Sequence, residues 1–203
     1  MYPLHPDTLE DQLTAYRQAC PEQAGLADDF LAFLRKTPQA FLREHATAHF
    51  TGSAWLQHAD GEQVLLMHHR KLDRWLQPGG HADGDADLRA VALREATEET
   101  GLQGLQVESG IFDLDRHWIP ARGTEAGHWH YDVRYRVTAP AGAQVQGNAE
   151  SLALPCSTAE AVTHEADRDE FLRPLARPCP ERRQACACSG RRPGHAARCL
   201  AAC

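Results

Sequence analysis

The stretch DLRAVALREATEET, residues 87–100, constrains the fold most, because its apolar residues recur at helical spacing between two strand-like regions. Asp85 or Asp87 is a suitable N-cap, and Gly101 is suited to end the helix. The spacing predicts one buried stripe, made of Leu88, Val91, Ala92 and Ala96.

Strand-like segments lie on both sides of this helix. Residues 49–57, HFTGSAWLQ, and residues 64–70, VLLMHHR, are separated by a turn that contains Asp-Gly, which predicts a hairpin. Residues 71–87 are rich in Gly and Asp and are predicted to be a loop. Residues 105–115 are predicted to form a strand, and residues 128–137, HWHYDVRYRV, alternate strictly between two faces. Strands that flank a helix in this way predict a mixed α/β sandwich.

The two ends of the chain differ from this middle region. Residues 1–45 are predicted to be a helical N-terminal extension with two helices and a short third helix after Thr37. Residues 46–154 are predicted to be the domain core. Residues 155–203 are predicted to be an irregular tail: the last 25 residues hold five arginines, five cysteines and one leucine. This composition indicates a segment that is disordered or comes from an altered reading frame.

Charge and hydropathy exclude some functions. The formal net charge is −7 and no basic run occurs in the first 170 residues, which argues against a nucleic acid partner. We find no apolar run of transmembrane length and no signal peptide at the N-terminus, so we expect a cytoplasmic protein without membrane contact.

Three glutamates, Glu95, Glu98 and Glu99, lie at helical positions i, i+3 and i+4, so their carboxylates share one face near the C-terminal end. Like charges in this arrangement repel one another, and the helix dipole disfavours anions there. A bound divalent cation would offset both effects, because Mg²⁺ prefers oxygen ligands. A solvated acidic face is the alternative reading. The preceding Pro78-Gly79-Gly80 segment allows close approach of a ligand to the backbone.

The run from Gly80 to Leu102 resembles the Nudix box, whose pattern is G-x5-E-x7-R-E-U-x-E-E-x-G-U with U aliphatic. It departs from the pattern at Ala86, where the family has its first glutamate. The resemblance implies a Nudix-like α/β/α sandwich with a mixed sheet. The positions that match are Gly80, Arg94, Glu95, Ala96, Glu98, Glu99, Gly101 and Leu102.

The resemblance also implies an activity: a metal-dependent pyrophosphohydrolase that cleaves the diphosphate linkage of a nucleoside diphosphate joined to another group, such as ADP-ribose or a nucleotide sugar. Mg²⁺ or Mn²⁺ is the implied cofactor and a small-molecule diphosphate the implied partner, with a homodimer as one option. Ala86 leaves a catalytically weakened binding or regulatory module as the alternative. The implied metal ligands are Glu95, Glu98, Glu99 and the Gly80 carbonyl. The implied catalytic residues are Glu98, Glu99 and Arg94. The candidates for the general base are Glu98, Glu99, Glu125 and Glu150.

Polar residues on residues 128–137 are further candidates. His128, His130 and Asp132 share one strand face, which fits either a transition-metal site or the lining of a substrate cleft. Arg134 continues that face toward phosphate or ribose. His81 follows Gly80 and is expected near the metals. These five residues are the candidate substrate contacts.

Overall fold

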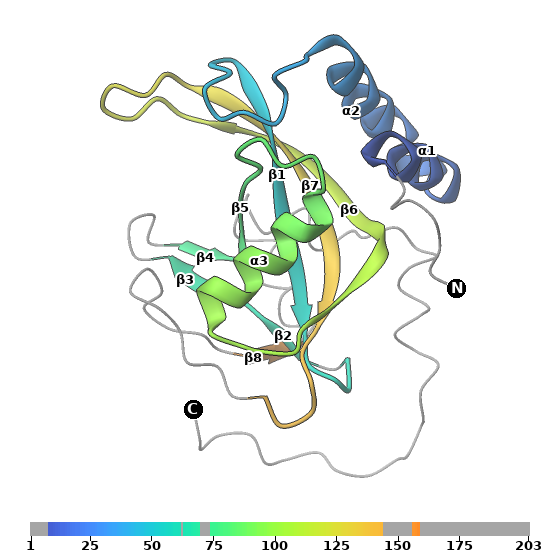
Figure 1. Cartoon of the computed structure of the whole chain (residues 1–203), viewed down its shortest axis with the longest axis vertical. Helices are drawn as coiled ribbons and strands as arrows, with labels where there is room; N and C mark the ends of the chain where they lie inside the picture. Colours follow the sequence, from blue (N-terminus) through green and yellow to red (C-terminus); the bar gives the residue numbers. More distant parts are fainter. Residues whose placement is uncertain (1–7, 62, 70–73, 144–155, 159–203) are drawn as a thin grey trace.

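The computed structural model describes residues 8–61, 63–69, 74–143 and 156–158 (Figure 1). Its elements are α1 (Leu9–Ala19), the 3-10 turn η1 (Pro21–Gln23), α2 (Ala24–Lys36), β1 (Ala48–Gln57), β2 (Gln63–Leu65), β3 (Met67–His69), β4 (Arg74–Leu76), β5 (Gly79–His81), α3 (Leu88–Thr100), β6 (Gln106–Ile119), β7 (His128–Thr138) and β8 (Cys156–Thr158).

Strand β1 lies at the centre of the main sheet. It pairs in parallel with β7 along its whole length, from Ala48↔Trp129 to Gln57↔Thr138. Strand β7 pairs antiparallel with β6, while β5 and β2 pair antiparallel with the other side of β1, and β8 extends β2. Strands β3 and β4 form a separate two-stranded sheet. The mixed sheet and the α/β class are therefore confirmed.

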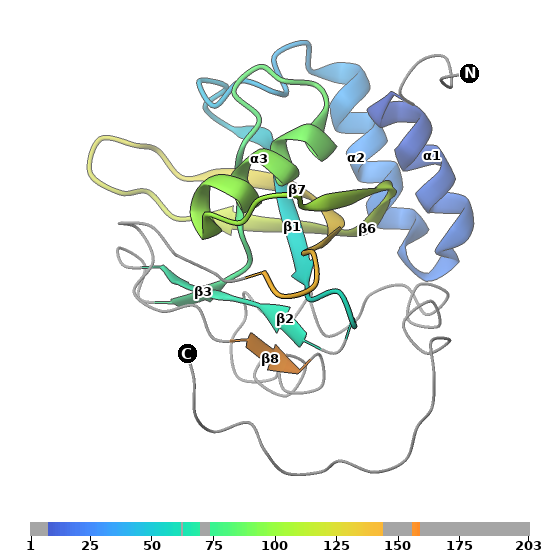
Figure 2. The same ribbon diagram turned by 60° about the horizontal axis from the view of Figure 1, so that its bottom comes forward.

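The helices pack on one face of this sheet. Phe50 of β1 and its register partner Tyr131 of β7 contact Phe30 of α2, with ring centroids 6.0 and 5.0 Å away. Gly52, on the same face of β1, lies directly beneath α3. Figure 2 shows α1, α2 and α3 gathered on this side of the strands. The buried apolar side chains between helices and sheet form one hydrophobic cluster.

Helix α3 forms as predicted. Asp87 Oδ1 accepts hydrogen bonds from the backbone N–H groups of Arg89 and Ala90, each at 3.2 Å, and so caps the first turn. Gly101 ends the helix with φ 70°, a left-handed conformation that glycine adopts without steric cost. All four residues of the predicted stripe, Leu88, Val91, Ala92 and Ala96, are at most 1% exposed.

The prediction of a loop over residues 71–87 was partly wrong, because β4 and β5 lie within it. Glycine makes the β5 pairing possible: a Cβ at Gly79 would lie 2.5 Å from Ser53 Oγ, and one at Gly80 would lie 2.7 Å from the Glu95 carboxylate. In the sequence the two glycines indicate a turn. In the structure they lie in a strand, where the absence of side chains leaves room for Ser53 and Glu95.

Other boundaries also differ from expectation. The third helix after Thr37 was wrong, since the following residues form hydrogen-bonded turns. The second strand of the predicted hairpin is interrupted at Leu66, where the chain leaves β2 for the separate sheet of β3. Strand β6 extends to Ile119, beyond the predicted end, because it stays paired with β7 without interruption from Asp113↔Arg134 to Ile119↔His128. The divisions at residues 45 and 155 stay predictions.

Within the described ranges, no helix is long and apolar enough to cross a membrane.

We expect Gly52→Ala to destabilise the fold by about 1–3 kcal/mol, as overpacking of a core does. The new Cβ would lie 2.7 Å from the Leu88 backbone oxygen, so α3 would have to move away from β1. Urea unfolding measures the effect. Gly25→Ala in α2 is the matched control, because nothing lies within 4 Å of its new Cβ, and it should be neutral or stabilising. Equal stability of the two variants would contradict this packing.

Candidate active site

The acidic face of α3 meets the backbone of β5. The Gly79 N–H donates a hydrogen bond to Glu99 Oε2 at 3.1 Å. The Glu95 carboxylate packs against Gly80 and is partly buried, and this burial raises the pKa of Glu95, with the Arg94 guanidinium opposing the shift. Glu98 is exposed on the same stretch of helix. The predicted residues Gly80, Glu95 and Glu99 are therefore brought together.

Arg94 connects the helix to the segment before it. Its Nη2 lies 3.1 Å from Glu95 Oε1 and donates to the backbone oxygen of His81 at 3.5 Å. Its Nη1 lies 3.8 Å from Asp85 Oδ2. These contacts join the Glu95 carboxylate to the end of β5. The role of Arg94 in orienting the glutamates stays a prediction.

The donor set on this face fits a hard divalent cation. Carboxylates and a backbone carbonyl are the ligands that Mg²⁺ and Mn²⁺ prefer. Glu95 is the most constrained donor, since its side chain is 19% exposed and its raised pKa marks a carboxylate that lacks full hydration. A cation at this place would add positive charge to that of Arg94 and so stabilise the ionised form of the partly desolvated Glu95 carboxylate.

The face of the sheet away from the helices carries a group of histidines. His128 and His130 lie there as the alternation of β7 predicts. His81 of β5, which was expected near the metals, has its ring in the same group, together with His49 of β1, which was not predicted. Each ring centroid of the three lies within 5.0 Å of that of His49. The signal was available: His49 shares its strand face with Thr51 and Ser53 in the period-two pattern of HFTGS.

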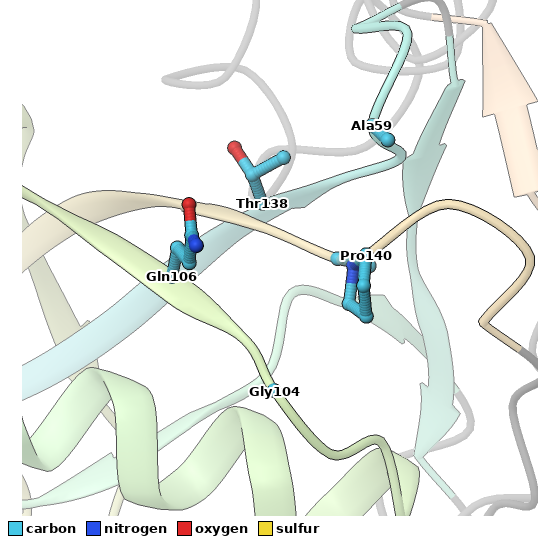
Figure 3. A pocket seen from close by; sticks show the side chains of 6 residues that line it. Ala59, Gly104, Gln106, Thr138 and Pro140 are labelled. Atoms are coloured by element: carbon cyan, nitrogen blue, oxygen red, sulfur yellow. The ribbon is translucent and has the colours of Figure 1, made fainter.

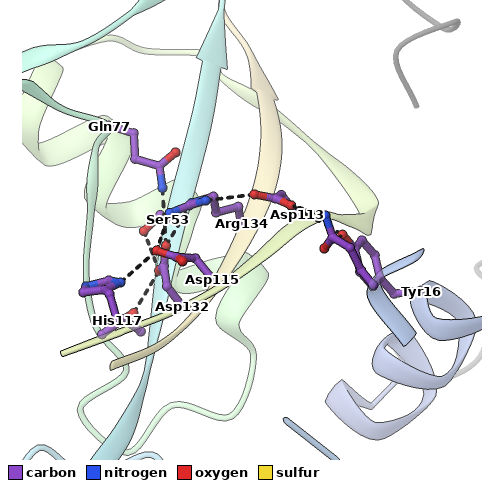
Figure 4. A network of polar contacts seen from close by, with 10 residues as sticks. Tyr16, Ser53, Gln77, Asp113, Asp115, His117, Asp132 and Arg134 are labelled. Carbon is purple, nitrogen blue, oxygen red and sulfur yellow. Dashed lines mark hydrogen bonds and ion pairs between the residues drawn. The ribbon is translucent and has the colours of Figure 1, made fainter. Parts of the chain in front are cut away.

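Asp132 and Arg134 belong to a buried polar network beside these histidines (Figure 4). Arg134 is 3% exposed and donates to three carboxylates: from Nη1 to Asp113 at 2.8 Å, from Nη2 to Asp115 at 2.9 Å, and from Nε to Asp132 at 3.1 Å. The alternating acids of FDLD in β6 were the missed signal here. Asp132 and Arg134 therefore have a structural role in this network. Their contact with substrate stays a prediction.

Further hydrogen bonds complete the network. The hydroxyls of Thr51 and Ser53 donate to Asp132 Oδ1 at 2.8 and 2.6 Å, and Gln77 donates to Asp132 Oδ2 at 3.3 Å. Tyr16 of α1 lies 3.4 Å from Asp113 Oδ1, which ties the N-terminal helices to the sheet. Asp132 is thus held by β1 and by Gln77, which lies between β4 and β5, as well as by Arg134.

Burial and the neighbouring charges shift the pKa values of Asp113, Asp115 and Arg134 to different extents. Burial raises the pKa of Asp113 to about 6, although the Arg134 guanidinium opposes this shift. Burial also acts to raise the pKa of Asp115, but Arg134 and His117 outweigh it and the pKa is lowered. Burial acts to lower the pKa of Arg134, but the three carboxylates raise it further. The Arg134 guanidinium favours the ionised forms of Asp113 and Asp115.

Some candidates do not join either group. Glu125 lies in the exposed turn between β6 and β7, where its backbone pairs with Arg122. Glu150 lies outside the described residues, so its role as general base stays a prediction.

A hollow at the far end of β7 carries no chemistry of this kind. None of its lining residues is acidic, basic or a histidine (Figure 3), so we place no catalytic role there. They are Ala59, Gly104, Gln106, Thr138, Ala139 and Pro140.

Comparison with known proteins identifies the family. The NUDIX domain model matches residues 49–175, more than half of the chain. The chain therefore belongs to the Nudix family, and the prediction of a Nudix-type hydrolase that acts on acid anhydrides in phosphorus-containing compounds is confirmed at that level. The match extends past residue 155 into the predicted tail.

Several solved structures resemble the chain. An Ap4A hydrolase of C. elegans in a binary complex is 17% identical, with 67% of this chain and 95% of that chain covered and a TM-score of 0.49. A NUDIX family hydrolase from Clostridium perfringens is 20% identical (63% and 96% covered, TM-score 0.46). A MutT protein from Methanosarcina mazei Go1 is 19% identical (65% and 95% covered, TM-score 0.45). The search of curated proteins found no match.

We expect Arg134→Met to lower the free energy of unfolding by about 3–5 kcal/mol at pH 8, because removal of one partner leaves buried carboxylates without a cation. The loss should be smaller at pH 5. Without Arg134, burial holds the folded-state pKa values of Asp113 and Asp115 above their unfolded values, so the folded state binds more protons and stability falls as pH rises.

Urea unfolding at pH 5 and pH 8 checks this expectation, with the native protein measured at both pH values. Arg116→Met is the matched control, because Arg116 pairs with Asp29 at the exposed surface and should cost less than about 1 kcal/mol. A loss in Arg134→Met that grows toward pH 5 would contradict the assigned charges.

Proposed function

We propose that this chain is a metal-dependent pyrophosphohydrolase that cleaves the diphosphate linkage of a nucleoside diphosphate joined to another group, for example ADP-ribose or a nucleotide sugar. The observation that carries the proposal is the contact between α3 and β5, where Glu95 packs against Gly80 and Glu99 accepts a hydrogen bond from Gly79. This contact gathers carboxylates and a backbone carbonyl at one edge of the sheet.

Three glutamates and one carbonyl would hold the metal. Glu95, Glu98, Glu99 and the Gly80 oxygen are the proposed ligands of Mg²⁺ or Mn²⁺. When bound, such an ion neutralises charge on phosphoryl oxygens and lowers the pKa of an attacking water. The exposed position of Glu98 supports a direct role, because its carboxylate reaches the solvent from which substrate arrives.

Arg94 would position these ligands. Its contacts with Glu95, Asp85 and the His81 backbone fix the carboxylate relative to β5. The general base is proposed among Glu98, Glu99, Glu125 and Glu150, without a choice between them. Glu99 already accepts the Gly79 hydrogen bond, which holds one of its oxygens toward the backbone.

The departure from the family pattern at Ala86 motivates the alternative of a binding or regulatory module with weak turnover. Ala86 is exposed, and Asp87 next to it caps α3. The helix start is therefore secured without a glutamate at position 86, which favours the hydrolase over the module.

The surroundings of the protein are proposed from the sequence. We propose a small-molecule diphosphate as the partner, no nucleic acid polymer, no membrane, a cytoplasmic location, and a homodimer as one arrangement. The net charge of −7 supports the exclusion of nucleic acid.

We expect Glu98→Gln to lower kcat by at least about a hundredfold, because the amide is neither a strong metal ligand nor a base. Product release is measured from ADP-ribose, a UDP-sugar and Ap4A, each with Mg²⁺, with Mn²⁺ and with chelator. The native protein should cleave at least one compound only when metal is present.

Glu22→Gln, in the exposed turn η1, is the control that should keep full activity. Circular dichroism and melting temperature establish that both variants fold. Turnover by a folded Glu98→Gln variant would contradict the assigned roles. Thermal stabilisation by a diphosphate compound without product from the native protein would favour the binding module.

A further inference from the structure

We propose that His49, His81 and His130 form a second metal site, which takes a divalent transition metal such as Zn²⁺ through imidazole nitrogens. The three residues come from the neighbouring strands β1, β5 and β7. The site lies on the face of the sheet opposite α3, so it is separate from the carboxylates of the proposed active site, and it stands whether or not the proposed hydrolysis occurs.

Strand register brings the three side chains to one place. His49 is paired with His130 between β1 and β7, and His81 is paired with Thr51, two residues along β1 from His49. Residues two apart on a strand point to the same face, so the three rings converge above the sheet. One ligand nitrogen from each ring can be chosen so that all three lie within 4.8 Å of one another.

The spacing of the rings matches that of a metal site. Their centroids are 5.0 Å apart for His49 and His81, 4.9 Å for His49 and His130, and 5.2 Å for His81 and His130. With a Zn–N bond of about 2.0–2.1 Å and a ring centre about 1.2 Å beyond the nitrogen, tetrahedral angles place the centroids about 5.2 Å apart. Coordination would require the rings to turn so that nitrogens now within 4.8 Å of one another approach to about 3.3 Å.

The buried ring of His49 is the independent observation that points to a ligand. His49 is 2% exposed, and within the described part of the chain neither Nδ1 nor Nε2 makes a hydrogen bond of acceptable geometry, although the His45 backbone lies near enough to oppose the fall in the pKa of the ring. Buried polar atoms normally find a partner, and one that does not costs about 1–3 kcal/mol. A metal ion bound to one nitrogen would satisfy it.

The protonation states suit metal binding. Burial lowers the pKa of His49 to about 4 and that of His130 to about 2, with the neighbouring histidines adding to both shifts. These two rings are therefore neutral near pH 7, and the neutral ring is the form that coordinates metals.

His128 forms a hydrogen bond with His130. The carbonyl of Ala126 accepts a hydrogen bond from His128 Nδ1 at 2.9 Å, so the neutral ring has its acceptor at Nε2. His130 Nε2 lies 3.2 Å from that acceptor and donates to it, which leaves His130 Nδ1 unprotonated. Ligating histidines commonly have their other nitrogen held by such a partner.

The two sites differ in the metals that they favour. Imidazole suits Zn²⁺, Co²⁺, Ni²⁺ and Cu²⁺, whereas the carboxylates of α3 suit Mg²⁺ and Mn²⁺. Three histidines leave one tetrahedral position open for water or an anion, as in zinc sites with three protein ligands.

Co²⁺ titration of the full chain, purified without a histidine tag and stripped of metal, tests the site. Co²⁺ in a tetrahedral nitrogen site gives intense visible absorption, and octahedral Co²⁺ gives weak absorption. We expect one equivalent with intense absorption, displaced by Zn²⁺. In His49→Phe, which keeps the ring volume, the Kd should rise at least about tenfold.

Two control variants separate this site from its surroundings. His58→Gln alters a histidine in the β1–β2 turn and should leave the Kd within about twofold. Glu98→Gln should keep the intense equivalent even where it abolishes hydrolysis, so failure of this site and failure of the proposed function are distinguishable.

Three results would overturn the proposal: weak octahedral absorption in the native protein, an unchanged Kd in folded His49→Phe, or loss of the intense equivalent in Glu98→Gln. Where His49→Phe does not fold, His130→Gln takes its place, and the native spectrum still decides between tetrahedral and octahedral ligation.

Discussion

The parallel pairing of β1 with β7 is the constraint on which the rest of the structure depends. Ten register pairs, from Ala48↔Trp129 to Gln57↔Thr138, join two strands that are distant in the sequence. The pairing fixes which side chains share a face. Phe50 and Tyr131 turn toward the helices, while His49 and His130 turn to the opposite side. One hydrophobic core and one polar face result from the same set of backbone hydrogen bonds.

The two faces of the sheet also carry different metal-binding and polar groups. On the helix side, the buried stripe of α3 packs on β1, and its glutamates reach β5 at the edge, where two glycines leave room for them. On the other side, histidines and aspartates from β1, β6 and β7 are buried together. Buried charge on that face is tolerated because Arg134 pairs with three carboxylates at once.

Local features of the sequence were sufficient for α3. Its capping residue, its stripe and its terminal glycine act within one helix, and the Nudix-type spacing of Arg94, Glu95, Glu98 and Glu99 lies within two turns. The alternation of β7 likewise depends only on neighbours two residues apart. Strand β5 escaped prediction because a Pro-Gly-Gly sequence indicates a turn unless Ser53 and Glu95 are known to lie beside it.

The histidine group and the Arg134 network escaped for a different reason. His49 shares a polar face of its strand with Thr51 and Ser53, but its neighbours on that face depend on pairing with His130, 81 residues away. Asp113 and Arg134 meet only after the register shifts in β6. Alternation in each strand marks a polar face, but neither strand alone indicates which residues of the other strand it will meet.

We propose that the α3 glutamates and β5 bind a hard divalent cation. Electron paramagnetic resonance of free Mn²⁺ during titration of the native protein, Glu95→Gln and His49→Phe measures this binding. We expect Glu95→Gln to weaken Mn²⁺ binding at least about tenfold and His49→Phe to leave it unchanged. Equal Mn²⁺ affinity in the native protein and in a folded Glu95→Gln variant would contradict it.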